Sequence, residues 1–144
     1  MLGSTPPSSA AETVLAGSCL CGGVRYQYRG EVNEISMCHC TQCQKAQGSA
    51  FAAVAPIESA RFTLLAGAGL LREYRATPLK ARVFCGRCGS PLYSARDDLP
   101  GVLRLRLGTL DTPVTCAHRH HKFTRAKAPW FDIADGLPQD LENA

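Results

Sequence analysis

The chain has 144 residues, of which 45% are hydrophobic, and it carries a formal net charge of +4 at pH 7. This size and composition suit one globular domain with an ordinary hydrophobic core, and no stretch approaches the roughly 20 apolar residues that a membrane-spanning helix needs. The lysines and arginines are spread along the chain without a long basic block, so the charge does not indicate nucleic-acid binding and suits an anionic small molecule equally well.

The amino terminus predicts no ordered element. Residues 1–13 are mostly Ser, Pro, Ala and Thr without periodicity, which predicts a disordered tail followed by one domain over residues 14–144. The first residues also lack the basic start and continuous apolar stretch of a secretion signal. We therefore expect a cytoplasmic protein.

Eight cysteines are the most informative residues of the chain, and seven of them lie in tight clusters. Disulfide frameworks usually scatter their cysteines over the loops of small secreted domains. C-x-C and C-x-x-C spacing in a chain without an export signal is more typical of metal sites. The spacing therefore favours metal ligands over disulfides.

The first cluster along the chain is the C-x-C pair Cys19 and Cys21. In an extended segment both sulfurs lie on one face, and Gly22-Gly23 then lets the backbone turn away without a steric penalty. Residues 24–28 alternate as a strand. Two thiols on one face provide half of a four-thiolate metal site.

The second cluster is Cys38-His39-Cys40-Thr41-Gln42-Cys43. If the segment is extended, Cys38 and Cys40 point to one face and His39 points to the other. A two-residue turn then brings Cys43 back to the first two cysteines. Three sulfurs can close on one metal ion in this arrangement.

The middle of the chain predicts short strands. Residues 44–49 indicate a polar loop or one helical turn, and residues 51–55 a buried strand that ends at Pro56. Partly alternating runs separated by Gly and Pro are typical of antiparallel β structure; they cover residues 61–65, 70–74, 80–84 and 103–107. We expect an all-β fold of short antiparallel sheets with little helix.

The strand at residues 103–107 alternates strictly between leucine and arginine. Such a pattern predicts one apolar face and one face that carries Arg104 and Arg106. A face of this kind is normally solvated, so we interpret both arginines as exposed.

A third cluster, Cys85-Gly86-Arg87-Cys88, places a C-x-x-C pair across a tight turn. Two C-x-C or C-x-x-C pairs make the ligand set of a closed structural zinc, which assigns one site to Cys19, Cys21, Cys85 and Cys88. The second cluster, Cys38, Cys40 and Cys43, then has an open fourth position, as catalytic zinc sites do. Two alternatives stay open: the second cluster could pair with the C-x-x-C cysteines instead, or a histidine could complete it as a second structural site.

These motifs resemble the glutathione-dependent formaldehyde-activating enzyme family, which includes centromere protein V. The matching segments run in order from Gly17 to Pro138; they are residues 17–24, 38–51, 82–92 and 108–111, and the stretch from His121 through Lys127-Ala128-Pro129-Trp130. The resemblance implies a zinc-binding β-tent fold with two Zn²⁺ ions per chain. It places a structural zinc on Cys19, Cys21, Cys85 and Cys88, and a second zinc on Cys38, Cys40 and Cys43.

The function that this resemblance implies is that of a carbon-sulfur lyase, which joins glutathione and formaldehyde as S-(hydroxymethyl)glutathione. A zinc ion at Cys38, Cys40 and Cys43 would favour the substrate thiolate, the nucleophile that adds to an aldehyde, and a thiol substrate could also strip that metal. The carboxylates of glutathione need cationic partners, for which the sequence offers Lys45, Arg72, Arg75, Arg104 and Arg106. The alternative is a non-catalytic zinc module that binds glutathione or a macromolecular partner; a homodimer is compatible with either function.

Several residues outside the clusters have a simpler interpretation. His118, His120 and His121 favour a surface patch over a metal tract, because adjacent side chains of a strand face opposite sides; only His121 belongs to the family motifs. Cys116 belongs to no cluster and is expected to be a small buried or half-exposed thiol. Trp130 is expected in the core, with a lid over a pocket as the alternative.

Overall fold

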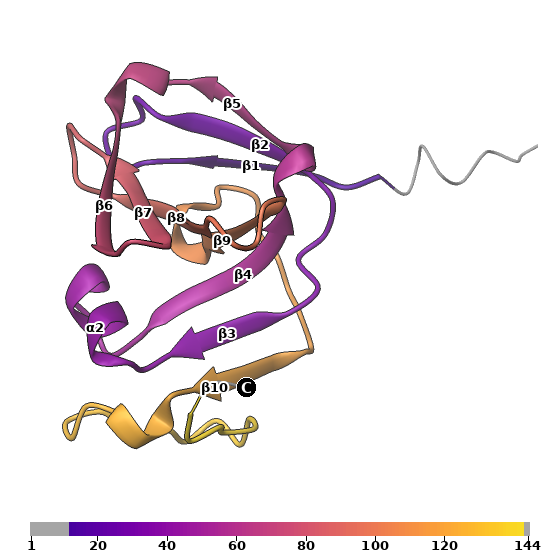
Figure 1. The fold of residues 1–144 in the computed structure, drawn as a ribbon. Coiled ribbons are helices and arrows are strands. Elements are labelled where there is room, and N and C mark those ends of the chain that lie inside the picture. The colour runs from indigo at the N-terminus through magenta and orange to yellow at the C-terminus, as the bar shows by residue number, and fades with distance from the viewer. Residues whose placement is uncertain (1–11, 143–144) are drawn as a thin grey trace, which may run out of the picture.

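The computed structural model describes residues 12–142 and consists of two β-sheets with little helix (Figure 1). The tail predicted for residues 1–13 lies almost entirely outside the described residues, and the first strand begins at Val14. The single α-helix of this part of the chain is α2, Thr41–Gln47, and none of its helices has the length and apolarity to cross a membrane. The predicted all-β class is confirmed.

The smaller sheet has three antiparallel strands in the order β1, β2, β5. Their bounds are β1 Val14–Ser18, β2 Arg25–Arg29 and β5 Phe62–Ala66. In β2 the side chains of Tyr26 and Tyr28 are buried and those of the flanking arginines are exposed, as the alternation of the sequence predicts. Gly17 lies opposite Tyr26, and any larger side chain there would overlap the tyrosine ring.

The larger sheet has seven strands in the order β10, β3, β4, β9, β8, β7, β6. Their bounds are β3 Ile35–Cys38, β4 Ala52–Glu58, β6 Leu71–Thr77, β7 Lys80–Cys85, β8 Pro91–Arg96, β9 Val102–Arg106 and β10 Arg119–Lys122. Neighbouring strands are antiparallel except β10 and β3, which run parallel. The antiparallel sheets that the sequence predicts are found everywhere except at this edge, where a long segment between β9 and β10 lets the chain return in the direction of β3.

The main hydrophobic core joins the two sheets. Tyr26 of the small sheet stacks on Phe62, and Phe62 contacts Tyr93 of the large sheet. Leu15, Ile57 and other apolar residues from both sheets fill the same cluster. Burial raises the pKa of Tyr26 to about 12, so its hydroxyl stays neutral and shares a hydrogen bond with Thr109 Oγ1 at 2.6 Å.

Two local segments differ from their predictions. Residues 41–47 form an α-helix, whereas a polar loop or one helical turn was expected for residues 44–49 and a two-residue turn between Cys40 and Cys43. Seven residues are too few to show an apolar period. Cys40 is its N-cap, and Gly48 ends it with a positive φ of 61°. Strand β4 also continues through Pro56, since β3 pairs with β4 only as far as Val54 and the missing N–H of the proline interrupts no ladder on that side.

Gly67 and Gly69 offer a matched test of how tightly the β5–β6 corner is built. Gly67 has a φ of 90°, and a Cβ there would lie 2.7 Å from Val24 Cα, whereas a Cβ on Gly69 meets nothing within 4 Å. We expect Gly67→Ala to lower the free energy of unfolding by about 2 kcal/mol or more, through backbone strain and overlap. Gly69→Ala should change it by about 0.5 kcal/mol at most. Urea unfolding of both variants measures the difference, and equal effects would contradict the close approach.

Candidate active site: three cysteines beside a cationic cavity

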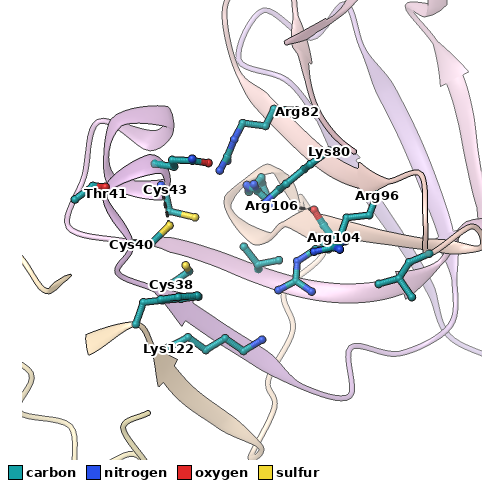
Figure 2. Close-up of a pocket in the computed structure, with 14 residues that line it drawn as sticks. Cys38, Cys40, Thr41, Cys43, Lys80, Arg82, Arg96, Arg104, Arg106 and Lys122 are labelled. Carbon is teal, nitrogen blue, oxygen red and sulfur yellow. Dashed lines mark hydrogen bonds between the residues drawn. The ribbon is translucent and has the colours of Figure 1, made fainter. Parts of the chain in front are cut away.

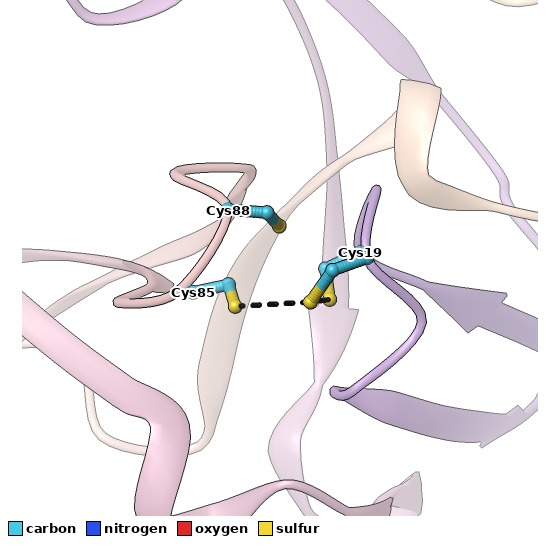
Figure 3. A group of neighbouring side chains, drawn as sticks. Cys19, Cys85 and Cys88 are labelled. Carbon is cyan, nitrogen blue, oxygen red and sulfur yellow. Dashed lines mark hydrogen bonds between the residues drawn. The ribbon is translucent and has the colours of Figure 1, made fainter.

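Four cysteines from the two sheets lie together at the end of the core. Cys19 and Cys21 come from the loop after β1, Cys85 is the last residue of β7, and Cys88 lies in the β7–β8 turn. Figure 3 shows Cys19 beside Cys85 and Cys88. All four Sγ atoms lie within 4.8 Å of one another, which is close enough for a tetrahedral thiolate site with Zn–S bonds near 2.3 Å. The loops that carry them belong to different sheets, so an ion here would fasten one sheet to the other.

Polar groups donate hydrogen bonds to sulfurs of this group. Val24 N donates to Cys19 Sγ at 3.2 Å, and Arg87 Nε donates to Cys21 Sγ at 3.3 Å. Hydrogen bonding by Ser90 lowers the pKa of Cys88 to about 5, whereas the pKa of the buried Cys85 is raised. The donor set is all sulfur, which fits zinc.

The second cluster lies where β3 meets α2. Cys38 is the last residue of β3, Cys40 caps the helix, and Cys43 lies in the first helical turn. Their Sγ atoms lie within 4.8 Å of one another (Figure 2). Cys43 N donates to Cys40 Sγ at 3.4 Å, so the helix cap and the cluster are the same piece of structure. The helical turn does what the predicted two-residue turn was expected to do, bringing the third sulfur back to the first two.

The surroundings of this cluster favour the thiolate form of one of its three cysteines. Hydrogen bonds from the Cys38 and Cys40 thiols, and then the nearby Arg82 guanidinium, lower the pKa of Cys43. The same contacts raise the pKa of Cys38, because its proton is shared with its neighbours. Three soft sulfur donors without a carboxylate fit zinc and leave a fourth coordination position for a ligand from outside the chain.

A cavity of about 620 Å³ opens beside these cysteines. Its lining contains six cationic side chains and no carboxylate; the cations are Lys80, Arg82, Arg96, Arg104, Arg106 and Lys122 (Figure 2). The sheet register explains the gathering. Arg82 lies opposite Ser94, which lies opposite Arg104, and Val54 lies opposite Arg106, so β7, β8, β9 and β4 present these residues on one face of the sheet.

Two of the arginines are poorly compensated inside the protein. Arg106 is only 4% exposed, and its Nη1 donates to the carbonyl of Arg104 at 3.0 Å and to Ser94 Oγ at 3.4 Å. Burial lowers the pKa of Arg106 to about 10, which leaves it cationic at neutral pH. Arg82 Nη1 is buried without a hydrogen-bond partner. Burial also lowers the pKa values of Lys80 and Lys122.

The pattern of clusters, helix and sheets matches one protein family. The family model described as "glutathione-dependent formaldehyde-activating enzyme" matches residues 14–126 of this chain. The chain belongs to this family. The resemblance seen in the cysteine motifs is thereby confirmed over most of the folded domain.

Two known proteins show how far the likeness extends. A protein of Schizosaccharomyces pombe, named an uncharacterized lyase, is 29% identical over 79 residues, which cover 55% of this chain and 56% of the yeast protein. The chain thus spans little more than half the length of that relative. A crystal structure of a Rhodobacter sphaeroides protein has 22% sequence identity and a TM-score of 0.58, and covers 68% of this chain and 89% of its own. This second likeness concerns the fold.

The cavity separates the five cations that the sequence offered as partners for carboxylates. Of the five candidates, Arg104 and Arg106 line the cavity, whereas Lys45, Arg72 and Arg75 do not. The interpretation of the arginine face of β9 as solvated is wrong, because Arg106 is buried. The sequence analysis missed Lys80, Arg82, Arg96 and Lys122; the alternation of Lys80 and Arg82 was the one signal available for them.

His39 turns away from the cluster, as expected, and joins a buried chain of hydrogen bonds. His39 Nε2 and His121 Nδ1 are 2.8 Å apart, and His121 Nε2 is 2.8 Å from Asp135 Oδ2. An ionised Asp135 accepts from His121 Nε2, and His121 Nδ1 shares the second hydrogen bond with His39 Nε2. The predicted surface patch is wrong for His120 and His121, which are 8% and 2% exposed: β10 pairs with β3 on one side, and the carboxyl-terminal segment at Pro138–Asp140 hydrogen-bonds to His121 on the other. His118 is exposed.

The negative charge of Asp135 stabilises this chain of hydrogen bonds, so its contribution to stability should depend on pH. The hydrogen bond from His121 lowers the pKa of Asp135. A depressed folded pKa gives stability that is present above the unfolded value near 3.9 and is lost as the pH falls through the lower folded value. We expect wild type to be more stable than Asp135→Asn at pH 6, with the difference shrinking below about pH 4. Thermal unfolding of both proteins from pH 6 to pH 3 tests this; a difference independent of pH would contradict the ionic role.

Two further residues lie outside the cavity. Cys116 is half-buried and belongs to neither cluster, as expected. Trp130 is 71% exposed, so its placement in the core is wrong, and it does not line the cavity beside the cysteines. Its ring contacts Phe131, whose own ring lies against His39 and Phe51.

Proposed function

We propose that this chain is a zinc-dependent carbon-sulfur lyase that forms and cleaves the adduct of glutathione and an aldehyde, with S-(hydroxymethyl)glutathione as the adduct of formaldehyde. The observation that carries the proposal is the position of a three-thiol cluster beside a cavity lined by cations. Such an arrangement offers a place for a thiol and a place for its carboxylates. The family membership and the name of the yeast relative support a lyase-type activity.

We assign one zinc ion to each cysteine cluster. Cys19, Cys21, Cys85 and Cys88 would hold the structural ion, and Cys38, Cys40 and Cys43 the ion at the reaction site. Bound at the second cluster, zinc supplies a positive charge that favours a substrate thiolate and polarises an aldehyde oxygen. The rest of the chemistry belongs to the chain's own side chains.

The cavity residues would bind and orient the adduct. Cations that line the cavity would hold the carboxylates of glutathione, and Phe123 and Val54 give the cavity an apolar side beside the cysteines. The reaction forms a carbon-sulfur bond while the carbonyl π-bond opens, and the proton that leaves the thiol ends on the new hydroxyl. Lys80 and Lys122 are suited to pass that proton, because burial lowers their pKa values toward the working range.

The cellular setting follows from the cysteines. All eight are free thiols, and thiolate clusters of this kind persist where glutathione and thioredoxin systems keep cysteines reduced. We therefore propose that the reaction takes place in the cytoplasm.

Exchange spectroscopy tests the proposal without a coupled assay. Formaldehyde and glutathione interconvert slowly with their adduct in buffer, and the rate is read from the exchange between the free and bound methylene signals in NMR. We expect the zinc-loaded protein to raise the exchange rate at least about tenfold over buffer, and Cys116→Ser to do the same. Binding of glutathione without faster exchange would favour the non-catalytic module. Neither binding nor faster exchange would reject the lyase and leave only a module that binds a macromolecular partner.

A further inference from the structure

The cations of the cavity exceed what glutathione can neutralise. Arg96 is paired with Asp98, to which its Nε and Nη2 donate at 2.9 and 2.7 Å. Within residues 12–142, none of the other five cavity cations forms an ion pair with a carboxylate. Glutathione brings two carboxylates, but it also brings an ammonium group, for which the cavity lining has no acidic partner.

The cysteine cluster does not remove this excess. Three thiolates around one zinc ion carry a net charge of about −1. The negative charges of Glu34 and Asp140 partly oppose the lowering of the Lys122 pKa by burial, but neither residue lines the cavity. Several positive charges therefore face the cavity uncompensated after the cluster is counted.

Buried cations make the excess significant. Burying a charged side chain costs free energy unless the charge is paired. Arg106 is only 4% exposed. Arg82 adds a buried guanidinium nitrogen with no hydrogen-bond partner. Both arginines line the cavity together with Cys43, so Arg82 Nη1 and the Arg106 guanidinium lie beside the proposed reaction site. A ligand oxyanion is the partner that such a pair lacks.

We propose that the preferred adduct carries a phosphate group, which binds between Arg82 and Arg106 next to the three cysteines. This inference rests on the proposed function and names its substrate class. A phosphate brings up to two negative charges and several acceptor oxygens in one group, and the planar guanidinium fork matches it in two-point contact. Lys80 and Arg104 lie on the same face of the sheet and complete the cradle.

The phosphate can belong to either half of the adduct, and two matched pairs of compounds separate the sources. Pantetheine and 4′-phosphopantetheine are thiols that differ only by a phosphate. Glycolaldehyde and glycolaldehyde phosphate, each with glutathione, differ in the same way on the aldehyde side. Calorimetric titration of the zinc-loaded protein gives the affinity of each compound, and NMR exchange gives its turnover.

We expect the phosphorylated member of at least one pair to bind at least about tenfold more tightly than its partner. Arg82→Gln should bring that ratio close to one, and Arg106→Gln should do so as well if it folds. Arg25→Gln, which removes an exposed arginine on the small sheet, should leave the ratio unchanged.

The outcomes distinguish this inference from the proposed function. Equal affinity within both pairs overturns the phosphate site, even if every adduct is turned over. Preference for the phosphorylated compounds without turnover upholds the phosphate site and rejects the lyase. A preference that survives Arg82→Gln and a folded Arg106→Gln places the phosphate elsewhere and overturns the assignment.

Discussion

Cys85→Ser is expected to destroy the folded state. Its thiol is fully buried and belongs to the four-cysteine group that links the loop after β1 to the β7–β8 turn. Structural zinc sites contribute about 10 kcal/mol or more of apparent binding free energy, which is comparable to the whole stability of a small domain. Losing one thiolate removes much of that binding free energy and leaves a serine hydroxyl where the site needs a sulfur ligand. Circular dichroism should show a melting temperature lowered by more than about 10 °C, or no folded signal at all.

The control for this variant is Cys116→Ser, which removes a thiol outside both clusters. Its melting temperature should stay within a few degrees of wild type, because surface substitutions away from special features usually change stability by about 0.5 kcal/mol or less. A Cys85→Ser protein as stable as Cys116→Ser would contradict the structural role of the four-cysteine group.

Cys40→Ser is expected to give the opposite result, a folded protein without activity. Cys40 is the N-cap of α2, and serine is among the best N-cap residues, so the helix keeps its capping hydrogen bond. The second cluster loses one of its three thiols and, on the proposed assignment, the zinc ion held there. We expect the NMR exchange rate to fall at least about a hundredfold toward the value in buffer, with a melting temperature lowered far less than in Cys85→Ser.

Thr41→Ser provides a matched control on the same turn, since Thr41 lines the cavity but offers no sulfur. It should keep both the fold and most of the activity. If Cys40→Ser and Cys85→Ser unfolded equally, the division into one structural and one reactive cluster would be wrong. A fully active Cys40→Ser would show that the second cluster takes no part in the reaction.

Most of what the sequence predicted about the site came from the spacing of the cysteines. C-x-C and C-x-x-C pairs fix how sulfurs lie over a few residues, so the sequence predicted the metal clusters before any long-range contact was known. The strict alternation of residues 103–107 likewise predicted which β9 residues share a face. Both are local properties of an extended backbone.

The cationic cavity could not be predicted, because it depends on which strands are neighbours. Arg82 and Arg104 are separated by 21 positions, and only the pairing of β8 with both β7 and β9 places them on one face. Covering of that face by the cysteine segment and by Phe123 is also a long-range event. The alternation of residues in a strand predicts which side chains share a face, but it does not predict which segments cover that face.

The histidine chain was missed for the same reason. His121 is next to His39 only because β10 returns to pair in parallel with β3. Adjacent histidines in an isolated strand suggest a surface patch, whereas this edge of the sheet is covered by the carboxyl-terminal segment. Asp135, which accepts the last hydrogen bond of this series, lies in no repeat or motif of the sequence.

Zinc content is the most direct test of the two-site account. Elemental analysis of freshly purified protein, kept reduced, should give two zinc ions per chain for wild type and one for Cys40→Ser. Two ions in Cys40→Ser would contradict the assignment of the second ion to Cys38, Cys40 and Cys43. One ion or none in the wild-type protein, even after incubation with zinc, would contradict the account as a whole.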